Sequence, residues 1–213
     1  MTEHVGTRPV HSTAWRRRLG IAQDCFLAVV AAVFFVVHAR AVADLQFTSV
    51  PFAVEQGLLA VLFLTRRRSR QTSTRLWDWV IAATSWLPLL ARPVGGVSAE
   101  LEVVGTGIQM MGLGLTIVGF SYLGRSFGVV AADRGLKIRG PYAIVRHPIY
   151  LSHSVTMGGF LIANPDVLNA TLVMVTVAGM LLRLRAEEAL LTRSAGYEEY
   201  RSRVRWRLLP GVY

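Results

Sequence analysis

Residues 21–43 read IAQDCFLAVVAAVFFVVHARAVA, and this stretch decides the fold class. A helix rises about 1.5 Å per residue, so about 20 mostly apolar residues cross the roughly 30 Å hydrocarbon core of a bilayer. Residues 41–43 have the small-residue pattern of a signal-peptide cleavage site, but His38 and Arg40 stand just before them and several apolar segments follow. We therefore predict a retained membrane helix rather than a cleaved leader.

The composition of the whole chain agrees with a membrane protein. Of its 213 residues, 53% are hydrophobic and 17% are charged, and the mean hydropathy is +0.43. Soluble domains average about 25% charged residues, and disordered chains need low hydrophobicity. Both classes are excluded, which leaves an integral membrane protein. The single cysteine, Cys25, allows neither an internal disulfide nor a Cys-rich metal site.

Further apolar segments follow the first. The other predicted spans are residues 49–65, residues 76–91 with Pro88 inside, and residues 101–123. Two shorter segments, residues 150–163 and 167–182, have 14 and 16 residues and fall near or below the lower limit for a span. They meet at an Asn-Pro-Asp turn, so we predict a tight helical hairpin packed against the other helices.

The predicted fold class is all-α, a polytopic integral membrane helical bundle with four spans, a C-terminal helical hairpin and a cytoplasmic helix. We expect the last helix to run from Arg183 to Val204. The chain divides into an N-terminal membrane region, residues 1–123, which holds an arm and the four spans, and a C-terminal region, residues 124–213. The second region carries the hairpin and the candidate cofactor-binding and catalytic residues.

The distribution of positive charge predicts the orientation. The net charge of +10 comes from 23 Lys and Arg against 13 Asp and Glu. The N-terminal arm, the loops after the second and fourth spans, and the tail hold 4, 5, 5 and 7 basic residues, and only Arg40 and Arg92 fall on the other side. Because cytoplasmic loops are enriched in Lys and Arg, both termini are predicted to be cytoplasmic. We expect membrane lipids as partners and no nucleic acid.

Small residues repeat every seven positions in the fourth predicted span. One set is Gly105, Gly112 and Gly119, and a second set, offset by two, is Gly107, Gly114 and Ser121. A heptad spacing keeps each set near one helix face and allows close approach of a neighbouring backbone. The sets predict helix packing, either within a monomer or across a homodimer.

Isolated ionisable residues in the spans are interpreted as interfacial or structural. Asp24, Glu55 and Asp78 lie close to predicted helix ends, where their carboxylates reach headgroup water. His38 is interpreted as a structural histidine near a helix end.

The densest polar motif is GPYAIVRHPIY at residues 140–150. Pro141 and Pro148 fix φ and disfavour helix in the residue before each, so the motif holds a defined irregular path with free backbone groups. Irregular backbone at membrane depth is tolerated only where protein buries it or where it lines a wet cavity. A ligand site and an interfacial loop are both compatible with this pattern.

A second dense motif is RLRAEE at residues 183–188. On a helix, Arg183 and Glu187 are i,i+4 neighbours, and Arg185 and Glu188 form an i,i+3 pair. These spacings suit ordinary surface ion pairs. They equally suit a carboxylate and a cation beside a ligand cavity, where Glu187 accepts from hydroxyls and Arg183 clamps a carboxylate.

These motifs together resemble the isoprenylcysteine carboxyl methyltransferases and, equally, the wider group of membrane phospholipid methyltransferases. The resemblance rests on Gly-Pro-Tyr-x3-Arg-His-Pro-x-Tyr from Gly140, a short helical hairpin, Arg-x-Arg-x-Glu-Glu from Arg183, and Gly-Tyr-x2-Tyr-x3-Val from Gly196, in the expected order. It covers residues 123–210, well under half of the chain. The N-terminal spans match only in being apolar.

The resemblance implies an S-adenosylmethionine pocket on the cytoplasmic side, with S-adenosylhomocysteine as product. Carried over by position, the cofactor-binding residues are Arg134, Gly135, Leu136, Lys137, Tyr142, Arg146, His147, Pro148, Ile149, Tyr150, Glu187 and Glu188. Arg183 would meet the methyl acceptor and, with Glu187, would act in catalysis. The strip at residues 134–137 departs from the histidine-led sequence of the eukaryotic enzymes.

The implied activity is methylation of a lipophilic small molecule or lipid. A prenylated peptide, a phospholipid amine, an isoprenoid acid and a quinone-like phenol all stay open as acceptors, with attack by O, N or S. Methyl transfer from a sulfonium needs no metal ion. Two alternatives are a sterol-reductase-like enzyme that binds NADPH through Arg134, Lys137 and Arg139, and a non-catalytic membrane scaffold.

Overall fold

The computed structural model describes residues 11–65, 71–72, 76–94, 96–124, 132–133, 136–193 and 196–212. Its α-helices are α1 (His11–Ala43), α2 (Val50–Thr65), α3 (Leu76–Ala83), α4 (Ala99–Leu123), α5 (Pro148–Ala163), α6 (Val167–Leu191) and α7 (Tyr197–Arg203). The 3-10 helices are η1 (Phe47–Ser49), η2 (Thr84–Leu90) and η4 (Gly140–Ala143). A two-residue strand, β1 (Gln71–Thr72), pairs antiparallel with β2 (Ala132–Asp133). The predicted all-α class is confirmed, with this one short pairing added.

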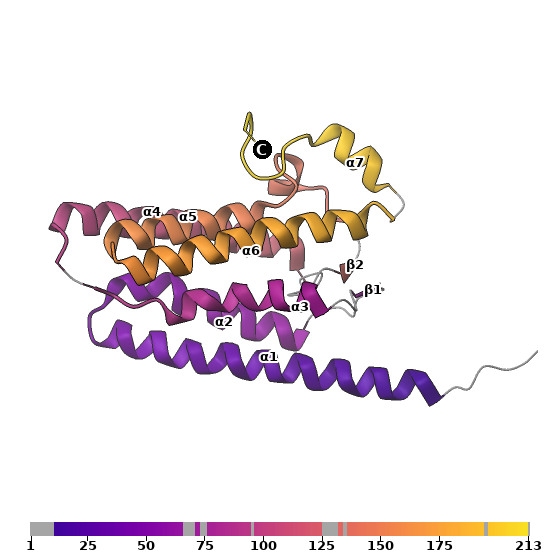
Figure 1. The fold of residues 1–213 in the computed structure, drawn as a ribbon, viewed down its shortest axis with the longest axis horizontal. Coiled ribbons are helices and arrows are strands. Elements are labelled where there is room, and N and C mark those ends of the chain that lie inside the picture. The colour runs from indigo at the N-terminus through magenta and orange to yellow at the C-terminus, as the bar shows by residue number, and fades with distance from the viewer. Residues whose placement is uncertain are drawn as a thin grey trace, which may run out of the picture.

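The long helices run along one axis and form two layers (Figure 1). In one layer α1 packs along α2, and in the other lie α4, α5 and α6, with α3 and η2 between the layers. Contacts between α5 and α4 are far more extensive than those between α5 and α6. The start of α1, the strand pairing and α7 all lie at the same end of the bundle.

Four helical segments are long and apolar enough to cross a membrane: Gly20–Ala43, Phe47–Thr65, Ala99–Leu123 and Val167–Leu191. The predicted span at residues 76–91 is not among them. There α3 ends at Ala83 and the chain continues as the 3-10 helix η2, which contains Pro88. Proline has no N–H to donate and its ring clashes with the preceding turn, so it interrupts an α-helix.

The fourth of these segments, α6, is longer than the sequence indicated. The apolar pattern predicts a helix over residues 167–182 as half of a short hairpin. The observed helix has 25 residues in total and ends at Leu191. The hairpin turn is confirmed: the Asp166 carboxylate caps α6 by accepting from the N–H of Leu168 at 2.9 Å. The tail helix predicted as far as Val204 is broken, because α7 begins only after Gly196, whose φ is +83°.

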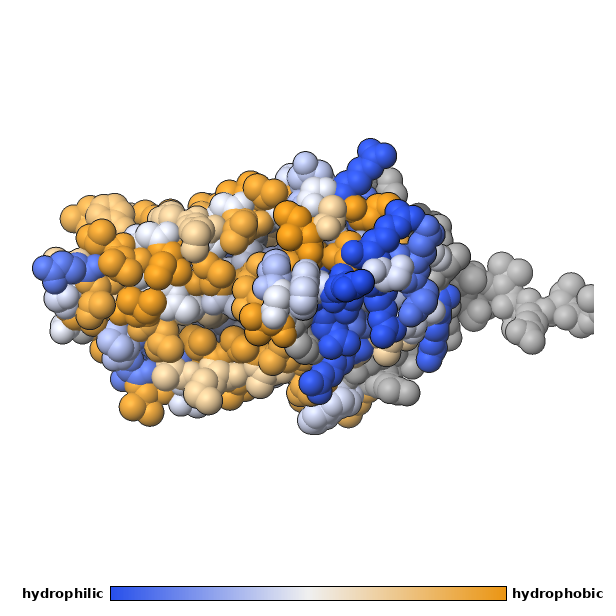
Figure 2. Space-filling view, turned by 90° about the horizontal axis from the view of Figure 1, so that it is seen from above, coloured by the Kyte–Doolittle hydropathy of each residue, from blue (hydrophilic) through white to orange (hydrophobic). Residues whose placement is uncertain are grey.

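The outer surface of the bundle is strongly apolar. Figure 2 shows hydrophobic residues over most of its length, with hydrophilic residues gathered near the end that carries α7. Val29, Val103 and Met174 are 61%, 72% and 72% exposed. Contiguous apolar surface of this extent is unfavourable in water and is what a bilayer covers. The fold is therefore consistent with a membrane protein.

The first glycine set brings α4 against α5. A Cβ built on Gly112 would lie 2.6 Å from the backbone nitrogen of Thr156, and one on Gly105 would lie 2.7 Å from the backbone oxygen of Gly159. Around Gly107 and Gly114, by contrast, a Cβ would meet nothing within 4 Å. The packing predicted for the first set is thus found inside the monomer, and it fixes the position of α5.

Candidate functional site

One cavity opens beside the proline-bracketed motif, where α2, η2, α4, α5 and α6 meet the segment that contains Tyr142. The cavity has a volume of about 180 Å³. A cavity that holds a single buried water needs roughly 10–15 Å³, so this one suits a ligand of many atoms. Among the described residues, no group of three or more His, Cys, Asp and Glu side chains could hold a metal ion.

The cavity brings together most of the residues singled out in the sequence. Those that line it are Leu136, Lys137, Tyr142, Arg146, His147, Ile149, Tyr150, Arg183 and Glu187. Pro148 is buried at the start of α5 and Glu188 lies behind the cavity wall; neither lines the space. Arg134 and Gly135 lie outside the described residues.

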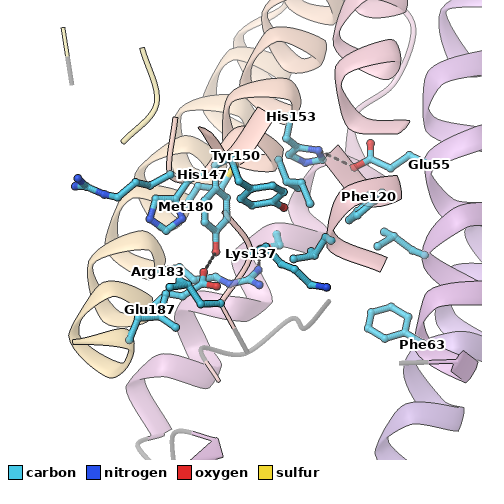
Figure 3. Close-up of a pocket in the computed structure, with 18 of the residues that line it drawn as sticks. Glu55, Phe63, Phe120, Lys137, His147, Tyr150, His153, Met180, Arg183 and Glu187 are labelled. Carbon is cyan, nitrogen blue, oxygen red and sulfur yellow. Dashed lines mark hydrogen bonds and ion pairs between the residues drawn. The ribbon is translucent and has the colours of Figure 1, made fainter. Parts of the chain in front are cut away.

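At one end of the cavity, a carboxylate, a cation and a phenol ring form a contact network (Figure 3). The Tyr150 hydroxyl donates to Glu187 Oε2 at 2.8 Å. The Arg183 guanidinium lies 5.5 Å from the centre of the Tyr150 ring, and its Nη1 donates to Ser85 Oγ at 3.4 Å. The i,i+4 spacing of Arg183 and Glu187 on α6 aims both at the first turn of α5, which carries Tyr150. A ligand here meets both signs of charge beside an aromatic face.

Tyr142 closes the same end of the cavity from η4. Gly140, two residues before Tyr142, has a φ of +63°, and a Cβ there would lie 2.5 Å from the Tyr122 ring, so this turn requires glycine. Tyr142 is buried, and its backbone oxygen accepts from the Tyr200 hydroxyl at 2.7 Å. Burial, and then the nearby Glu187 carboxylate, raise the pKa of Tyr142 well above its ordinary value. The Tyr142 hydroxyl therefore stays protonated and can donate to a ligand.

Glu188 is buried and holds the motif in place from behind. Its Oε1 accepts from Arg146 Nε at 2.8 Å and contacts His147 Nε2 at 3.2 Å, and its Oε2 accepts from Arg207 Nε at 2.9 Å. The Arg185–Glu188 surface pair that the spacing suggested is wrong, because Arg185 is exposed to solvent and Glu188 faces the protein interior. Glu188 thus supports the cavity wall without lining the cavity.

The segment after α7 pairs with the same motif. The backbone N–H of Arg146 donates to Trp206 O, and that of His147 donates to Arg207 O, both at 2.9 Å. Arg146 Nη1 also donates to Val204 O at 2.9 Å. Two backbone N–H groups of the irregular motif, those of Arg146 and His147, are therefore satisfied by the C-terminal segment. No local pattern in the sequence indicates this pairing, because it joins residues about 60 positions apart.

The other end of the cavity holds an ion pair that sequence reasoning missed. Glu55 is 6% exposed, and its Oε1 lies 2.8 Å from Nδ1 of His153. The interfacial interpretation of Glu55 is wrong, because α2 packs this carboxylate against α5. One feature of the sequence indicates that His153 belongs to the site: it follows Tyr150 by three residues, so both lie on one face of α5.

Aromatic side chains form an apolar wall of the cavity. Phe63 and Trp86 stack with ring centroids 6.4 Å apart, and Phe120 lines the cavity beside them. These residues come from α2, η2 and α4, so the cavity is built by both regions of the chain. The structural interpretation of His38 agrees with its position: it is buried, stacks on Phe52 at 5.3 Å and does not line the cavity.

Replacing Tyr200 with phenylalanine is expected to lower stability by about 1–2 kcal/mol near neutral pH, because the buried Tyr142 carbonyl loses its donor. Burial raises the pKa of Tyr200 to about 12; Arg146 opposes the shift and Glu188 adds to it. With the folded pKa above the unfolded one, this stabilisation is complete below about pH 10 and is lost as pH rises through 12. Thermal midpoints of both proteins from pH 8 to 12 should therefore converge. A constant difference across that range contradicts the assignment.

No protein-family model matches this sequence, and no curated protein matches it. Function is therefore inferred from the cavity and the motifs that surround it.

Proposed function

We propose that this chain is an integral membrane methyltransferase that uses S-adenosylmethionine to methylate a lipophilic acceptor, with both termini in the cytoplasm. The observation that carries the proposal is the meeting of Tyr142, Tyr150, Arg183 and Glu187 around one cavity. Three separate segments supply them, and the same segments carry the motifs that resemble membrane methyltransferases. Ordinary ion pairs on the protein surface would give no reason for residues from three segments to meet at one cavity.

The residues present fit this cofactor. It carries an ammonium, a carboxylate, a sulfonium and a flat adenine, so its site needs both signs of charge, hydroxyl donors and apolar or aromatic walls. Glu187 would hold the ammonium, Lys137 would hold the carboxylate, and the rings of Tyr142 and Tyr150 suit a sulfonium. When bound, the cofactor supplies an electrophilic methyl group. The protein supplies position, which is the larger contribution to a reaction of two bound partners.

Arg183 is placed to orient the acceptor. Its guanidinium is held between Ser85 on η2 and the ring of Tyr150, next to the aromatic wall. A group delivered by a lipid can approach along α2 and α4, whose outer faces carry exposed apolar residues such as Val61 and Leu115. The acceptor then reaches the cavity without crossing water.

The reductase alternative has less support. NADPH would need basic contacts to an extra phosphate, and of the residues considered for this, Lys137 lines the cavity while Arg139 is exposed and does not. Calorimetric titration of the purified chain separates the three possibilities. Saturable binding of S-adenosylhomocysteine without binding of NADPH supports the proposal; the reverse supports the reductase, and binding of neither supports a scaffold.

Glu187→Ala is expected to weaken S-adenosylhomocysteine binding about 10- to 100-fold, because a charge-assisted hydrogen bond contributes roughly 1.5–3 kcal/mol. Calorimetry on the detergent-purified variant measures the change. Glu102→Ala, which removes an exposed carboxylate from the first turn of α4, serves as control and should bind as wild type. Unchanged affinity in Glu187→Ala would show that this carboxylate only pairs with Tyr150.

Arg183→Ala is expected to reduce turnover more than it reduces cofactor affinity, since Arg183 is assigned to the acceptor. Membranes incubated with radiolabelled methyl donor and then extracted for lipid give the turnover, and calorimetry gives the affinity. The matched control is Arg185→Ala, which removes an exposed arginine two residues away. Equal losses of turnover and affinity in Arg183→Ala contradict the acceptor role.

A further inference from the structure

The Glu55–His153 pair is not used by the proposed cofactor site. Figure 3 shows it on the far side of Tyr150 from Arg183 and Glu187. His153 Nδ1 is 2.8 Å from Glu55 Oε1, and the imidazole is 18% exposed and lines the cavity. Among the hydrogen bonds of the described residues, none engages Nε2 of His153. A carboxylate therefore orients the ring, and the second nitrogen is left for a ligand.

A purely structural role explains this pair poorly. Removing two charged groups from water costs several kcal/mol per ion, and well-packed apolar side chains often stabilise such a site as well or better. Gln56, the next residue on α2, also lines the cavity and is buried, and its Oε1 has no hydrogen-bond partner. Buried polar atoms without partners are rare and costly. Three polar groups on this part of the cavity wall, one of them with an unpaired oxygen, indicate a polar ligand group.

The charges at this end of the cavity determine which polar group of a ligand fits there. A carboxylate on the ligand would bring a second negative charge close to Glu55. A hydrocarbon would leave the polar side chains unpaired. A hydroxyl is neutral and both donates and accepts, so it can pair with Nε2 of the His153 imidazole while donating to Oε1 of Gln56. Phe120 lies near this pair in Figure 3, and together with Phe63 and Trp86 it lines the same cavity, so the cavity wall suits an aromatic ring.

We propose that this end of the cavity binds the hydroxyl group of a neutral aromatic lipophile, a phenol, through His153, which Glu55 orients, and Gln56. The inference deepens the proposed function by naming the chemical class of its lipophilic ligand, and it rests on that function only in assigning this ligand to the same cavity as the methyl donor. Binding of the hydroxyl itself requires no methyl donor, so the two proposals can fail separately.

The first experiment compares three ligands of one shape. The full chain in lipid nanodiscs, with no methyl donor present, is titrated with tritiated 4-octylphenol and with 4-octylanisole and 4-octylbenzoate as competitors. We expect saturable binding of the phenol, about tenfold tighter than either competitor, as loss of one buried hydrogen bond implies. Equal affinity for the anisole overturns the proposal, because that ether cannot donate. Tighter binding of the benzoate overturns it in favour of a carboxylate ligand.

The second experiment tests the residues. Glu55→Gln and His153→Gln should each lower affinity for 4-octylphenol about tenfold, and the double variant should lose little more, because the two side chains act as one unit. His38→Gln is the control: it replaces another buried histidine, outside the cavity, and should bind as wild type. Wild-type affinity in both single variants overturns the proposal. If a variant fails to fold, the comparison of the three ligands on the unaltered protein still decides.

Binding of S-adenosylhomocysteine, measured on the same preparation, separates the two proposals. If that ligand binds and the phenol does not, the phenol site is overturned and the methyltransferase proposal stands. If the phenol binds and S-adenosylhomocysteine does not, the phenol site is supported and the methyltransferase proposal fails.

Discussion

Glu188→Ala is expected to destabilise the fold by about 3–5 kcal/mol, the cost of removing one partner from a buried ion pair. Arg146 and His147 are 8% and 7% exposed, and both contact Glu188 Oε1. Without the carboxylate, the Arg146 guanidinium stays buried beside backbone carbonyls alone. The link from α6 to Arg207 is lost as well.

Thermal unfolding in detergent measures this effect. For a chain of this size, the expected cost corresponds to a fall in the midpoint of roughly 10 °C. Glu198→Ala is the matched control, because Glu198 is exposed on α7 and its pair with Arg201, at 3.4 Å, is solvent-accessible. Such exposed pairs contribute at most about 1 kcal/mol. Similar small changes in both variants would contradict the assignment of Glu188 as the buried anchor of the motif.

This anchoring gives a physical reason for the presence of both motifs in one chain. Arg146 and Glu188 come from different segments and meet behind the cavity, while Tyr150 and Glu187 meet in front of it. Each of the two adjacent glutamates on α6 therefore pairs with the proline-bracketed motif on a different side. One pair fixes the wall, and the other presents polar atoms to a ligand.

The helices themselves were largely predictable from sequence, because apolar length is a local property. The first span, the Asn-Pro-Asp turn and the long α4 all follow from stretches of neighbouring residues. The errors are also local in origin. Hydropathy includes Pro88 in a predicted span, and it ends the last apolar segment before the charges of residues 183–188, although α6 continues to Leu191. Hydropathy alone does not reveal that partners from other elements satisfy those charges.

The site was predictable only in part, for a similar reason. Tyr142, Tyr150, Arg183 and Glu187 stand in dense motifs and were named from sequence, whereas the aromatic wall and Glu55 come from segments that look merely apolar. Long-range pairs leave no periodic pattern. A glutamate in α2 and a histidine in α5, 98 positions apart, are joined only by the fold.

Gly112→Ala should destabilise the protein by about 2–3 kcal/mol, in the upper part of the range for overpacking a tight contact. A Cβ at this position would lie 2.6 Å from the backbone nitrogen of Thr156, so α5 must move away from α4. At Gly114, on a different face of the same helix, the expected change in stability has the opposite sign, because a Cβ there meets nothing within 4 Å. There alanine should stabilise the helix by about 0.5–1 kcal/mol, because glycine is a poor helix former.

Thermal midpoints of the two single variants test this reversal of sign, and ligand binding tests its consequence for function. Tyr150 and His153 both project from α5, so a displaced α5 should weaken binding of S-adenosylhomocysteine in Gly112→Ala while Gly114→Ala binds as wild type. Two destabilising variants of equal size would mean that both glycine sets are in contact, as a homodimer across the second set requires. Two stabilising variants would mean that α4 and α5 are not closely packed, and the placement of the cavity wall would then be wrong.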